Sequence, residues 1–392
     1  MKILHVIPQF PLFGDNTVVG GHANALYVLA KTQAAAGHDV TILSHAPNHN
    51  GAFKIANQIN VVSLDSRLTP GTYRHAVGFI LMATVWLFRR ASQYDLVHGH
   101  SGFIDYVLLT ALVALLHRRP TVHSLYCPIE KRRGRLANPL YSALLRWCIA
   151  RVGAMSSISA NVHGSLCQFT HRSECGVVVR CPIDCVRFHP GDEREFRSAL
   201  GIADDEIAIL FVGNTTPQKN LKGTLDAFAH LAQSTCRSRL IVTTELRHSS
   251  PDEQKVQLMQ QAEDLGIFAD IIQLGIVHDM PVLMRACDIL VAPFLDSLGP
   301  SDYFLAALEA MSSAKPVVVS AVGGMPEVVD SSVGRLIDPI DPDDFACALQ
   351  QFVADEHLRR SLGDSGRRRI VQYFDPNLIV NQIDAVYRRI AS

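Results

Sequence analysis

The sequence predicts an α/β protein of two doubly wound domains, and three observations lead to this prediction. Short apolar runs alternate with helical patterns through roughly the first 180 residues. The alternation breaks at residues 181–193 (CPIDCVRFHPGDE), where prolines and a glycine mark a linker, and then resumes. The chain has 392 residues, 48% of them apolar and 19% charged, which is enough for two cores of ordinary size.

The first series opens with an apolar strand at residues 2–7, which Pro8 ends. A loop follows, and then a helix over residues 22–36 with apolar side chains at helical spacing. Gly37 ends this helix, and a second strand covers residues 40–43. This order is a βαβ unit with parallel strands. Further strands are predicted at residues 59–64, 96–98 and 121–123.

The second series predicts helices at residues 221–233 and 251–265 and a terminal helix at 377–390. Its strands are predicted at residues 208–212, 240–244, 271–274, 289–292 and 317–320. We therefore expect domains at residues 1–190 and 191–375, followed by a terminal helix within residues 376–392. Ligands of such sheets bind beyond the carboxyl ends of the strands, so the two domains are expected to face a cleft.

The net charge of -1 conceals an uneven distribution. Residues 1–190 hold 18 Lys and Arg against 8 Asp and Glu, and residues 191–392 hold 18 against 29. A basic half favours anions such as phosphates or acidic lipid, although the two halves could also simply attract each other. Nucleic acid is excluded as a partner, because no binding module occurs and aromatic residues do not interleave with the basic ones.

Cysteine usage and apolar runs bear on the compartment. Nine cysteines without a C-x-x-C pair indicate reduced thiols and no metal site, since Cys181 and Cys185 lack the paired spacing of zinc ligands. No apolar run reaches the length of a membrane span, and residues 77–88 and 107–116 suit core helices or, with the arginines after them, interfacial ones. No leader is expected, because Met1 runs directly into a strand. We expect a cytoplasmic protein, alone or peripheral on the inner face of a membrane.

Gly20 and Gly21 follow a strand and a loop and open a helix. Glycines at a helix start let backbone N–H groups approach an anion, and the helix dipole favours negative charge there. The pair predicts a phosphate contact. The spacing is not that of a dinucleotide-binding fingerprint, and no P-loop occurs in the chain, so NAD-dependent enzymes and P-loop NTPases are excluded.

Two charged side chains stand where a nucleotide would need them. Lys219 follows the strand at residues 208–212, so it lies at a carboxyl edge where a diphosphate needs a cation. Glu309 lies among apolar neighbours on a helix and requires a partner, for which ribose hydroxyls or an internal cation would serve. The N–H groups of Tyr303, Phe304 and Leu305, at the start of that helix, could hold phosphate.

Several segments together resemble the family-4 retaining glycosyltransferases of GT-B architecture, also described as glycosyl transferases group 1. GGHANALYVLAKTQAAAGHDVTIL resembles the first βαβ unit of that family, and YDLVHGHS (residues 94–101) a later strand. RCPIDCVRFHP (residues 180–190) is similar to its linker, and FVGNTTPQKNL to its VGRLxxxKG segment. The most specific matches are LEAMSSAKPVV and VGGMPEVV. The resemblance covers almost the whole chain.

The resemblance implies roles for these residues. Gly20 and Gly21 would line the donor phosphates and sugar, and His123 would hydrogen-bond the donor sugar. Lys219 would bind the leaving diphosphate, and Glu309 the ribose. It also implies Rossmann-like domains with a terminal helix packing back toward the N-terminal one, a nucleoside diphosphate sugar as co-substrate, retention at the anomeric carbon, and neither metal nor other cofactor.

The chain departs from the family pattern at two places. Asn214 stands where the family has an arginine after VG. Ser301 stands where the family has the first glutamate of an E-x7-E pair, with Asp302 beside it as a substitute shifted by one residue. We place Asn214, Ser301 and Asp302 in the donor site, and both changes bear on donor identity and activity.

A basic cluster follows the segment of His123 and belongs to the acceptor or membrane side of the expected cleft: Lys131, Arg132, Arg133 and Arg135. The expected acceptor is a glycan, a lipid-linked sugar or a small molecule, with contact to an anionic membrane surface. The expected function is sugar transfer to an acceptor hydroxyl in polysaccharide or glycolipid assembly. Glycosylation of a soluble natural product, or a degenerate domain that binds nucleotide sugar without turnover, are the alternatives.

Overall fold

The structure is a computed structural model, and it describes residues 1–13, 17–18, 20–46, 49, 51–56, 58–65, 73–129, 138–231, 237–243, 252–297 and 301–391. The chain forms two compact units. The first contains Met1–Pro182 and Pro376–Ser392, and Ser301 and Asp302 also return to it. The second contains Ile183–Ser297 and Tyr303–Asp375, so the boundary predicted at residue 190 falls within the second unit.

The first unit is built on an eight-stranded sheet with the order β10-β9-β8-β7-β1-β4-β6-β5. All neighbours are parallel except β5, which forms an antiparallel hairpin with β6 that the sequence analysis did not predict. The strands are β1 (Lys2–Gln9), β4 (Asp39–His45), β5 (Gly51–Ile55), β6 (Ile59–Ser63), β7 (Leu96–Ser101), β8 (Thr121–Leu125), β9 (Ala154–Ser157) and β10 (Val177–Val178). A separate pair, β2 (Leu12–Phe13) and β3 (Thr17–Val18), flanks the first loop.

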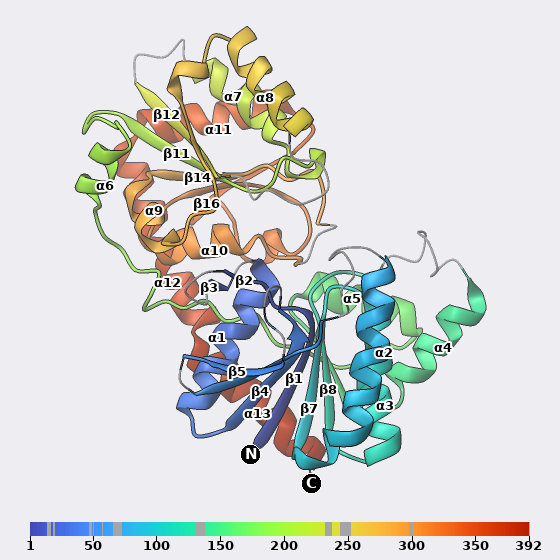
Figure 1. Cartoon of the computed structure of the whole chain (residues 1–392). Helices are drawn as coiled ribbons and strands as arrows, with labels where there is room; N and C mark the ends of the chain where they lie inside the picture. The colour runs from blue at the N-terminus through green and yellow to red at the C-terminus, as the bar shows by residue number, and fades with distance from the viewer. Residues whose placement is uncertain are drawn as a thin grey trace. The chain divides into compact units, whose positions relative to one another are not determined.

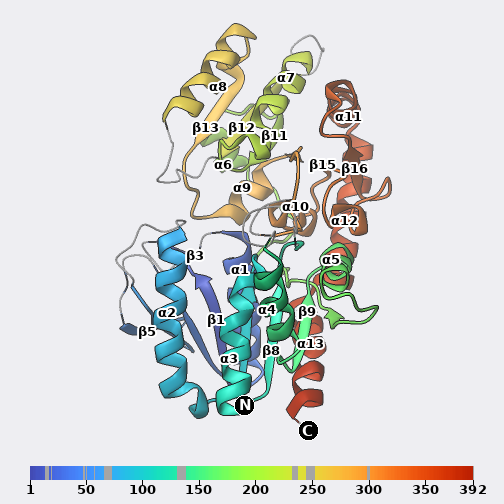
Figure 2. The ribbon, with the colours of Figure 1, turned by 90° about the vertical axis from the view of Figure 1, so that its right-hand side faces the viewer.

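Helices cover both faces of this sheet (Figure 1). On one face, α1 (Gly21–Ala35) and the terminal helix α13 (Pro376–Ala391) share a core with the strands, so the prediction that the last helix packs on the N-terminal domain is confirmed. On the other face, α2 (Tyr73–Arg90) and α3 (Val107–His117) enclose a second core, and α4 (Pro139–Ile149) packs beside α3 (Figure 2). The remaining helix, α5 (Ala160–Thr170), contacts β9 and β10.

The second unit has a six-stranded parallel sheet with the order β13-β12-β11-β14-β15-β16. Its strands are β11 (Ile207–Val212), β12 (Ser238–Thr243), β13 (Ile271–Leu274), β14 (Ile289–Ala292), β15 (Val317–Ser320) and β16 (Gly334–Ile337). Its helices are α6 (Arg194–Ala199), α7 (Leu221–Leu231), α8 (Asp252–Asp264), α9 (Met280–Ala286), α10 (Leu305–Ser312), α11 (Pro342–Ala354) and α12 (Glu356–Phe374). The parallel order places the carboxyl ends of β11 and β14 side by side, which is where this unit can bind a ligand.

Candidate functional site

In the second unit, Lys219 lies at the carboxyl edge of β11, as the sequence predicts. It ends a 3₁₀ turn, Pro217–Lys219, that follows the strand. Its Nζ atom lies 3.7 Å from the ring centroid of Phe294, which follows the neighbouring strand β14. A cation over an aromatic face is attracted by the ring quadrupole, so Phe294 holds the ammonium group at this edge. The backbone N–H of Leu295 also donates to the carbonyl of Gln218, at 2.9 Å, and ties the two loops together.

Phe294 also joins Lys219 to the start of α10. Its ring centroid lies 4.2 Å from that of Phe304, the N-terminal cap residue of the helix. Tyr303, Phe304 and Leu305 are all buried, and the N–H of Phe304 donates to Sδ of Met325 at 3.3 Å. One of the three N–H groups expected to hold phosphate is therefore already directed at sulfur, a weak acceptor.

Glu309 lies half-buried on α10, in a helix whose other residues are mostly buried. Asn214 closes its own loop: its Oδ1 atom accepts from the Thr216 hydroxyl at 2.5 Å and from the Thr216 N–H at 3.2 Å. This arrangement is an Asx turn, in which a short polar side chain shapes the backbone two residues on. The position that carries an arginine in the family thus serves the loop after β11 in this chain.

In the first unit, Gly20 caps α1 with φ 96° and ψ 133°. A positive φ of this size strains residues that carry a Cβ, so glycine is required here even though a Cβ would meet no neighbour within 4 Å. Gly21 is the first residue of the helix, and the ring of the following His22 lies 6.0 Å from that of Tyr126.

Asp302 is fully buried, and it anchors the short segment of Ser301 and Asp302 to the first unit. Its carboxylate oxygens accept from the hydroxyl of Ser159 at 2.6 Å and from the amide of Asn161 at 2.9 Å, and its N–H donates to the carbonyl of Tyr126 at 2.7 Å. Both oxygens are thus engaged at the start of α5, which Ser159 caps. The neighbouring Ser301 has a buried hydroxyl without a hydrogen-bond partner among the described residues.

His123 lies within β8 and is fully buried. Its Nε2 atom is 2.9 Å from the hydroxyl of Ser101 and its Nδ1 atom 2.8 Å from that of Thr110, so both ring nitrogens already have protein partners. Gly99 makes this possible, because a Cβ there would lie 2.5 Å from Nδ1 of His123. Burial lowers the pKa of His123 to about 3, which keeps the ring neutral.

Tyr126 is the residue of this segment that stands beyond the end of β8. The sequence analysis did not select it, although counting along the strand to its carboxyl end would have done so. Its hydroxyl lies 3.2 Å from Nδ1 of His100. The first unit therefore presents Gly20, His22 and Tyr126 near one carboxyl edge, while His123 lies behind that edge.

Tyr126 is one end of a chain of buried hydrogen bonds. Nε2 of His100 lies 2.8 Å from Nδ1 of His5, whose Nε2 lies 2.8 Å from Oε1 of Gln33. Because an amide oxygen only accepts, His5 donates from Nε2 and accepts at Nδ1 from His100, which in turn accepts from the Tyr126 hydroxyl. The proton of each of these two histidines is thereby assigned to Nε2.

The chain continues through Gln33 to the terminal helix. The Gln33 amide donates to the hydroxyl of Tyr387 at 3.3 Å, and this hydroxyl lies 2.6 Å from Nδ1 of His98. Nε2 of His98 lies 2.7 Å from the hydroxyl of Ser124. Ligand atoms of His5, His98 and His100 lie within 4.8 Å of one another, a spacing open to a metal ion, but every one of their ring nitrogens has a hydrogen-bond partner.

These histidines predict that the first unit loses stability in mild acid. Burial lowers the pKa of His5 to about 4, and that of His98 and His100 well below 6.5. Below pH 6.5 the unfolded chain therefore binds more protons than the folded chain. The free energy of unfolding is highest above that pH, and below it each histidine lowers this free energy by about 1.4 kcal/mol per pH unit. Tryptophan fluorescence during urea unfolding measures this, since Trp86 and Trp147 both lie in the first unit.

An exposed histidine provides the control for this prediction. His171 lies on the surface of the same unit with φ 55°, a conformation that asparagine tolerates. His171→Asn should leave the slope of stability against pH unchanged. A midpoint that stays constant from pH 7.5 to pH 5 would show that the buried histidines do not titrate with unfolding.

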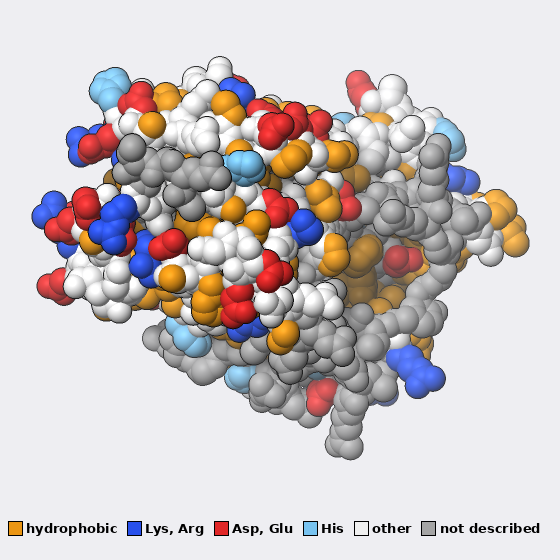
Figure 3. Space-filling view, turned by 90° about the horizontal axis from the view of Figure 1, so that it is seen from above, with side chains coloured by type: hydrophobic (Ala, Val, Ile, Leu, Met, Phe, Trp, Pro, Cys, Tyr) orange, Lys and Arg blue, Asp and Glu red, His pale blue; other side chains and the backbone are white. Residues whose placement is uncertain are grey.

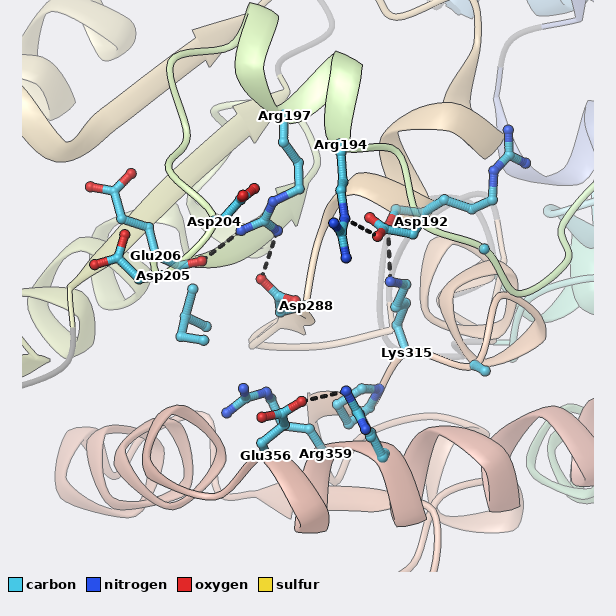
Figure 4. A pocket seen from close by; sticks show the side chains of 16 residues that line it. Asp192, Arg194, Arg197, Asp204, Asp205, Glu206, Asp288, Lys315, Glu356 and Arg359 are labelled. Carbon is cyan, nitrogen blue, oxygen red and sulfur yellow. Dashed lines mark hydrogen bonds and ion pairs between the residues drawn. The ribbon is translucent and has the colours of Figure 1, made fainter.

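A cavity of about 580 Å³ in the second unit lies at the amino edge of its sheet, opposite the edge that carries Lys219. It is lined where β11, β14 and β15 begin, by Ile207, Asp288 and Pro316 among others. Figure 4 shows Arg197 directed between Asp288, at 2.9 Å, and the carbonyl of Glu206, at 2.6 Å. Lys315, which also lines this cavity, donates to the carbonyl of Arg285 at 2.9 Å. This cavity lies at the amino ends of the strands, and charged side chains that line it are engaged within the protein. We therefore do not assign the sugar donor to it.

Two family models match the chain. Residues 19–187 match the model described as Glycosyltransferase Family 4, and residues 192–369 match the one described as Glycosyl transferases group 1. The D-inositol 3-phosphate glycosyltransferase of Frankia alni is 31% identical over 284 residues, which cover 69% of this chain and 68% of that protein. The chain belongs to glycosyltransferase family 4.

Two further proteins are similar to this chain over almost its whole length. The MMP alpha-(1->4)-mannosyltransferase of Mycolicibacterium hassiacum is 25% identical, over 96% of both chains. The structure of Anabaena Alr3699/HepE in complex with UDP and glucose matches 98% of each chain with a TM-score of 0.78 and 22% identity. The predicted GT-B fold is confirmed, and the chain is a glycosyltransferase of GT-B type.

Two predictions concern the surroundings of the site, and the structure bears on only one of them. The cluster Lys131, Arg132, Arg133 and Arg135 lies outside the described residues. Among the described residues, no helix combines the length and apolar character needed to cross a bilayer.

Proposed function

We propose that this family-4 enzyme transfers a sugar from a nucleoside diphosphate sugar to an acceptor hydroxyl, with retention, in polysaccharide or glycolipid assembly. The bond from the anomeric carbon to the diphosphate breaks, and the acceptor oxygen bonds to that carbon on the same face. The acceptor proton leaves with the nucleoside diphosphate. The observation that supports this best is the contact of the Lys219 ammonium group with Phe294, whose ring packs on Phe304 at the start of α10.

The chemistry of that contact fits a departing diphosphate. Negative charge grows on the leaving oxygens as the bond breaks, and a preorganised cation with a helix N-terminus stabilises it. In the proposal, Lys219 and the N-terminus of α10 stabilise this negative charge, and no metal ion or other cofactor is required. Glu309, on the same helix, would accept hydrogen bonds from the two ribose hydroxyls. In the first unit, Gly20, Gly21 and Ser301 would face the donor, and Tyr126 is the one polar residue that we add to those chosen from the sequence.

A binding domain without turnover is the second candidate. Two observations favour it: Asn214 bonds its own loop, and Asp302 has both carboxylate oxygens engaged within the first unit. Neither side chain replaces the charged group that the family has at its place. Glycosylation of a soluble natural product instead of a glycan or lipid-linked sugar is the alternative for the acceptor.

A donor panel tests the proposal. The protein is mixed with UDP-, GDP-, ADP- and dTDP-sugars, and thermal shift and nucleoside diphosphate release are recorded with soluble and lipid-linked acceptors. One donor should stabilise the protein, and Glu309→Gln should weaken its binding about 10–100-fold, because hydrogen bonds to a charged group are lost. Glu263→Gln, an exposed glutamate of α8, is the matched control and should bind as the wild type does.

The outcomes separate the candidates. Release of diphosphate with a product of unchanged anomeric configuration, by proton NMR, supports retaining transfer. Stabilisation by a donor without release in the presence of every acceptor supports the binding domain. No stabilisation by any donor contradicts both.

A further inference from the structure

The helices α2, α3 and α4 form a neighbouring row on one face of the first unit (Figures 1 and 2). Each of them has large apolar side chains exposed on its surface. A surface helix normally turns polar residues to water, but here large apolar side chains are exposed although the inner sides of the helices already fill a core. The apolar face consists of Leu81, Val85 and Phe88 of α2, Leu115 and Leu116 of α3, and Leu140, Leu144 and Trp147 of α4.

The spacing of these residues shows that the exposure is regular. On α2 and on α4 the exposed apolar positions follow the same i, i+4, i+7 pattern, which places three side chains on one stripe of each helix. Phe88 is 61% exposed, Leu81 62% and Leu140 80%. These two stripes, with Leu115 and Leu116 of α3, are not the single scattered apolar residues of an ordinary surface.

The charged side chains that belong to these three helices are all basic. The three helices contain no aspartate or glutamate. They run in the same direction because each connects parallel strands, so their last turns lie along one edge. The arginine rim at this edge consists of Arg89, Arg90, Arg118, Arg119, Arg146 and Arg151. Among the described residues, no ion pair joins a carboxylate to any of them.

Two arginines of the rim are directed along aromatic rings of the same helical layer. Arg90 lies 5.7 Å from the ring centroid of Trp86, and Arg151 lies 4.8 Å from that of Trp147. Trp and Arg side by side suit the boundary between hydrocarbon and headgroups, where the ring is buried and the guanidinium binds phosphate. By contrast, the face in Figure 3 has acidic and basic side chains close together.

We propose that the apolar face and the arginine rim dock the protein onto an anionic lipid bilayer. The apolar side chains enter the boundary between headgroups and acyl chains, and the arginines bind lipid phosphates. A second copy of the chain is a poorer occupant, because the helices of a second such face would supply no carboxylate to the arginine rim. An acidic protein would match the arginine rim but not a broad face made of apolar side chains. The inference does not depend on the proposed transfer reaction.

Vesicle sedimentation tests the docking face. The full chain is mixed with phosphatidylcholine vesicles that contain either no anionic lipid or about one third phosphatidylglycerol. We expect binding to the anionic vesicles alone, and its release by about 1 M salt, which shortens the Debye length to roughly 3 Å. The triple variant Leu81→Gln, Phe88→Gln, Trp147→Gln should bind at least about 10-fold more weakly, because three buried apolar contacts are lost. Arg89→Gln with Arg118→Gln should remove the preference for anionic lipid.

A matched triple variant on the second unit provides the control. Val256, Ile340 and Val371 are also exposed apolar residues, and their replacement by glutamine should leave vesicle binding unchanged. All variants are compared by thermal unfolding and by the donor-induced thermal shift, which the docking variants should not alter. Equal sedimentation with neutral and anionic vesicles overturns the proposal. Wild-type binding by the docking triple variant also overturns it, as does a dimer that this variant converts to a monomer.

Discussion

Replacing Lys219 by alanine is expected to lower kcat by about 10²–10³-fold, the usual effect of removing one preorganised group that stabilises charge in the transition state. The ammonium group lies over Phe294 at the carboxyl edge of β11, and the proposed diphosphate gains charge only as its bond to the sugar breaks. The fall in kcat should therefore exceed the rise in the KM for the donor. Initial rates over a range of donor concentrations give both values.

Lys222→Ala is the matched control for this variant. Lys222 lies three positions along the chain, exposed on α7, and its Nζ pairs with Asp226 at 2.8 Å. An exposed pair of this kind contributes little, so kcat should change by no more than about twofold. If Lys219→Ala retains the wild-type kcat while donor still binds, the diphosphate is neutralised elsewhere and the role given to Lys219 is wrong.

The two variants also show how far the sequence alone led to this site. The place of Lys219 follows from a local rule, that the loop after a parallel strand lies at the ligand-binding edge, and the structure has it there. The part played by Phe294 was not predicted, because it depends on the pairing of β11 with β14, which are far apart in the chain. Helices and parallel strands can be predicted from the local periodicity of the sequence. Contacts between loops depend on the order of the strands in the sheet, which local periodicity does not reveal.

The segment around residue 302 illustrates the same limit. The sequence analysis placed Ser301 and Asp302 in the donor site by resemblance, because the first glutamate of the family's E-x7-E pair stands eight residues before the position of Glu309. In the structure Asp302 bonds Ser159 and Asn161 and belongs to the first unit, while Tyr303 begins a stretch of the second. A chain that crosses between units within two residues leaves no mark in the hydrophobic pattern, since both sides of the crossing are buried. The antiparallel β5 was missed because its register is set by β6.

Gly363→Ala is expected to destabilise the second unit by about 2–3 kcal/mol, within the range for overpacking of a tight contact. Gly363 lies on α12, and a Cβ there would be 2.1 Å from the carbonyl oxygen of Ala314, in the turn after α10. Ala314 has φ 57°, so this turn is already in an uncommon conformation and cannot readily move aside. The helix is fixed as well, since Arg367 donates to the carbonyls of Phe188, at 2.7 Å, and Ser312, at 2.6 Å.

Calorimetry measures this effect as a fall in the melting temperature of the second unit of roughly 5–10 °C. Gly366→Ala, on the same helix, is the matched control. A Cβ there would lie 3.5 Å from the side chain of Met311, an ordinary contact, so the higher helix propensity of alanine should stabilise by up to about 1 kcal/mol.

The same pair of glycines connects stability with function, because both pack against α10 or the turn after it. The helix α10 also carries Glu309. If Gly363→Ala pushes α12 away from the turn after α10, donor-induced stabilisation should weaken in this variant and persist in Gly366→Ala. A Gly363→Ala protein that melts as the wild type does would show that the turn at Ala314 yields instead of the helix.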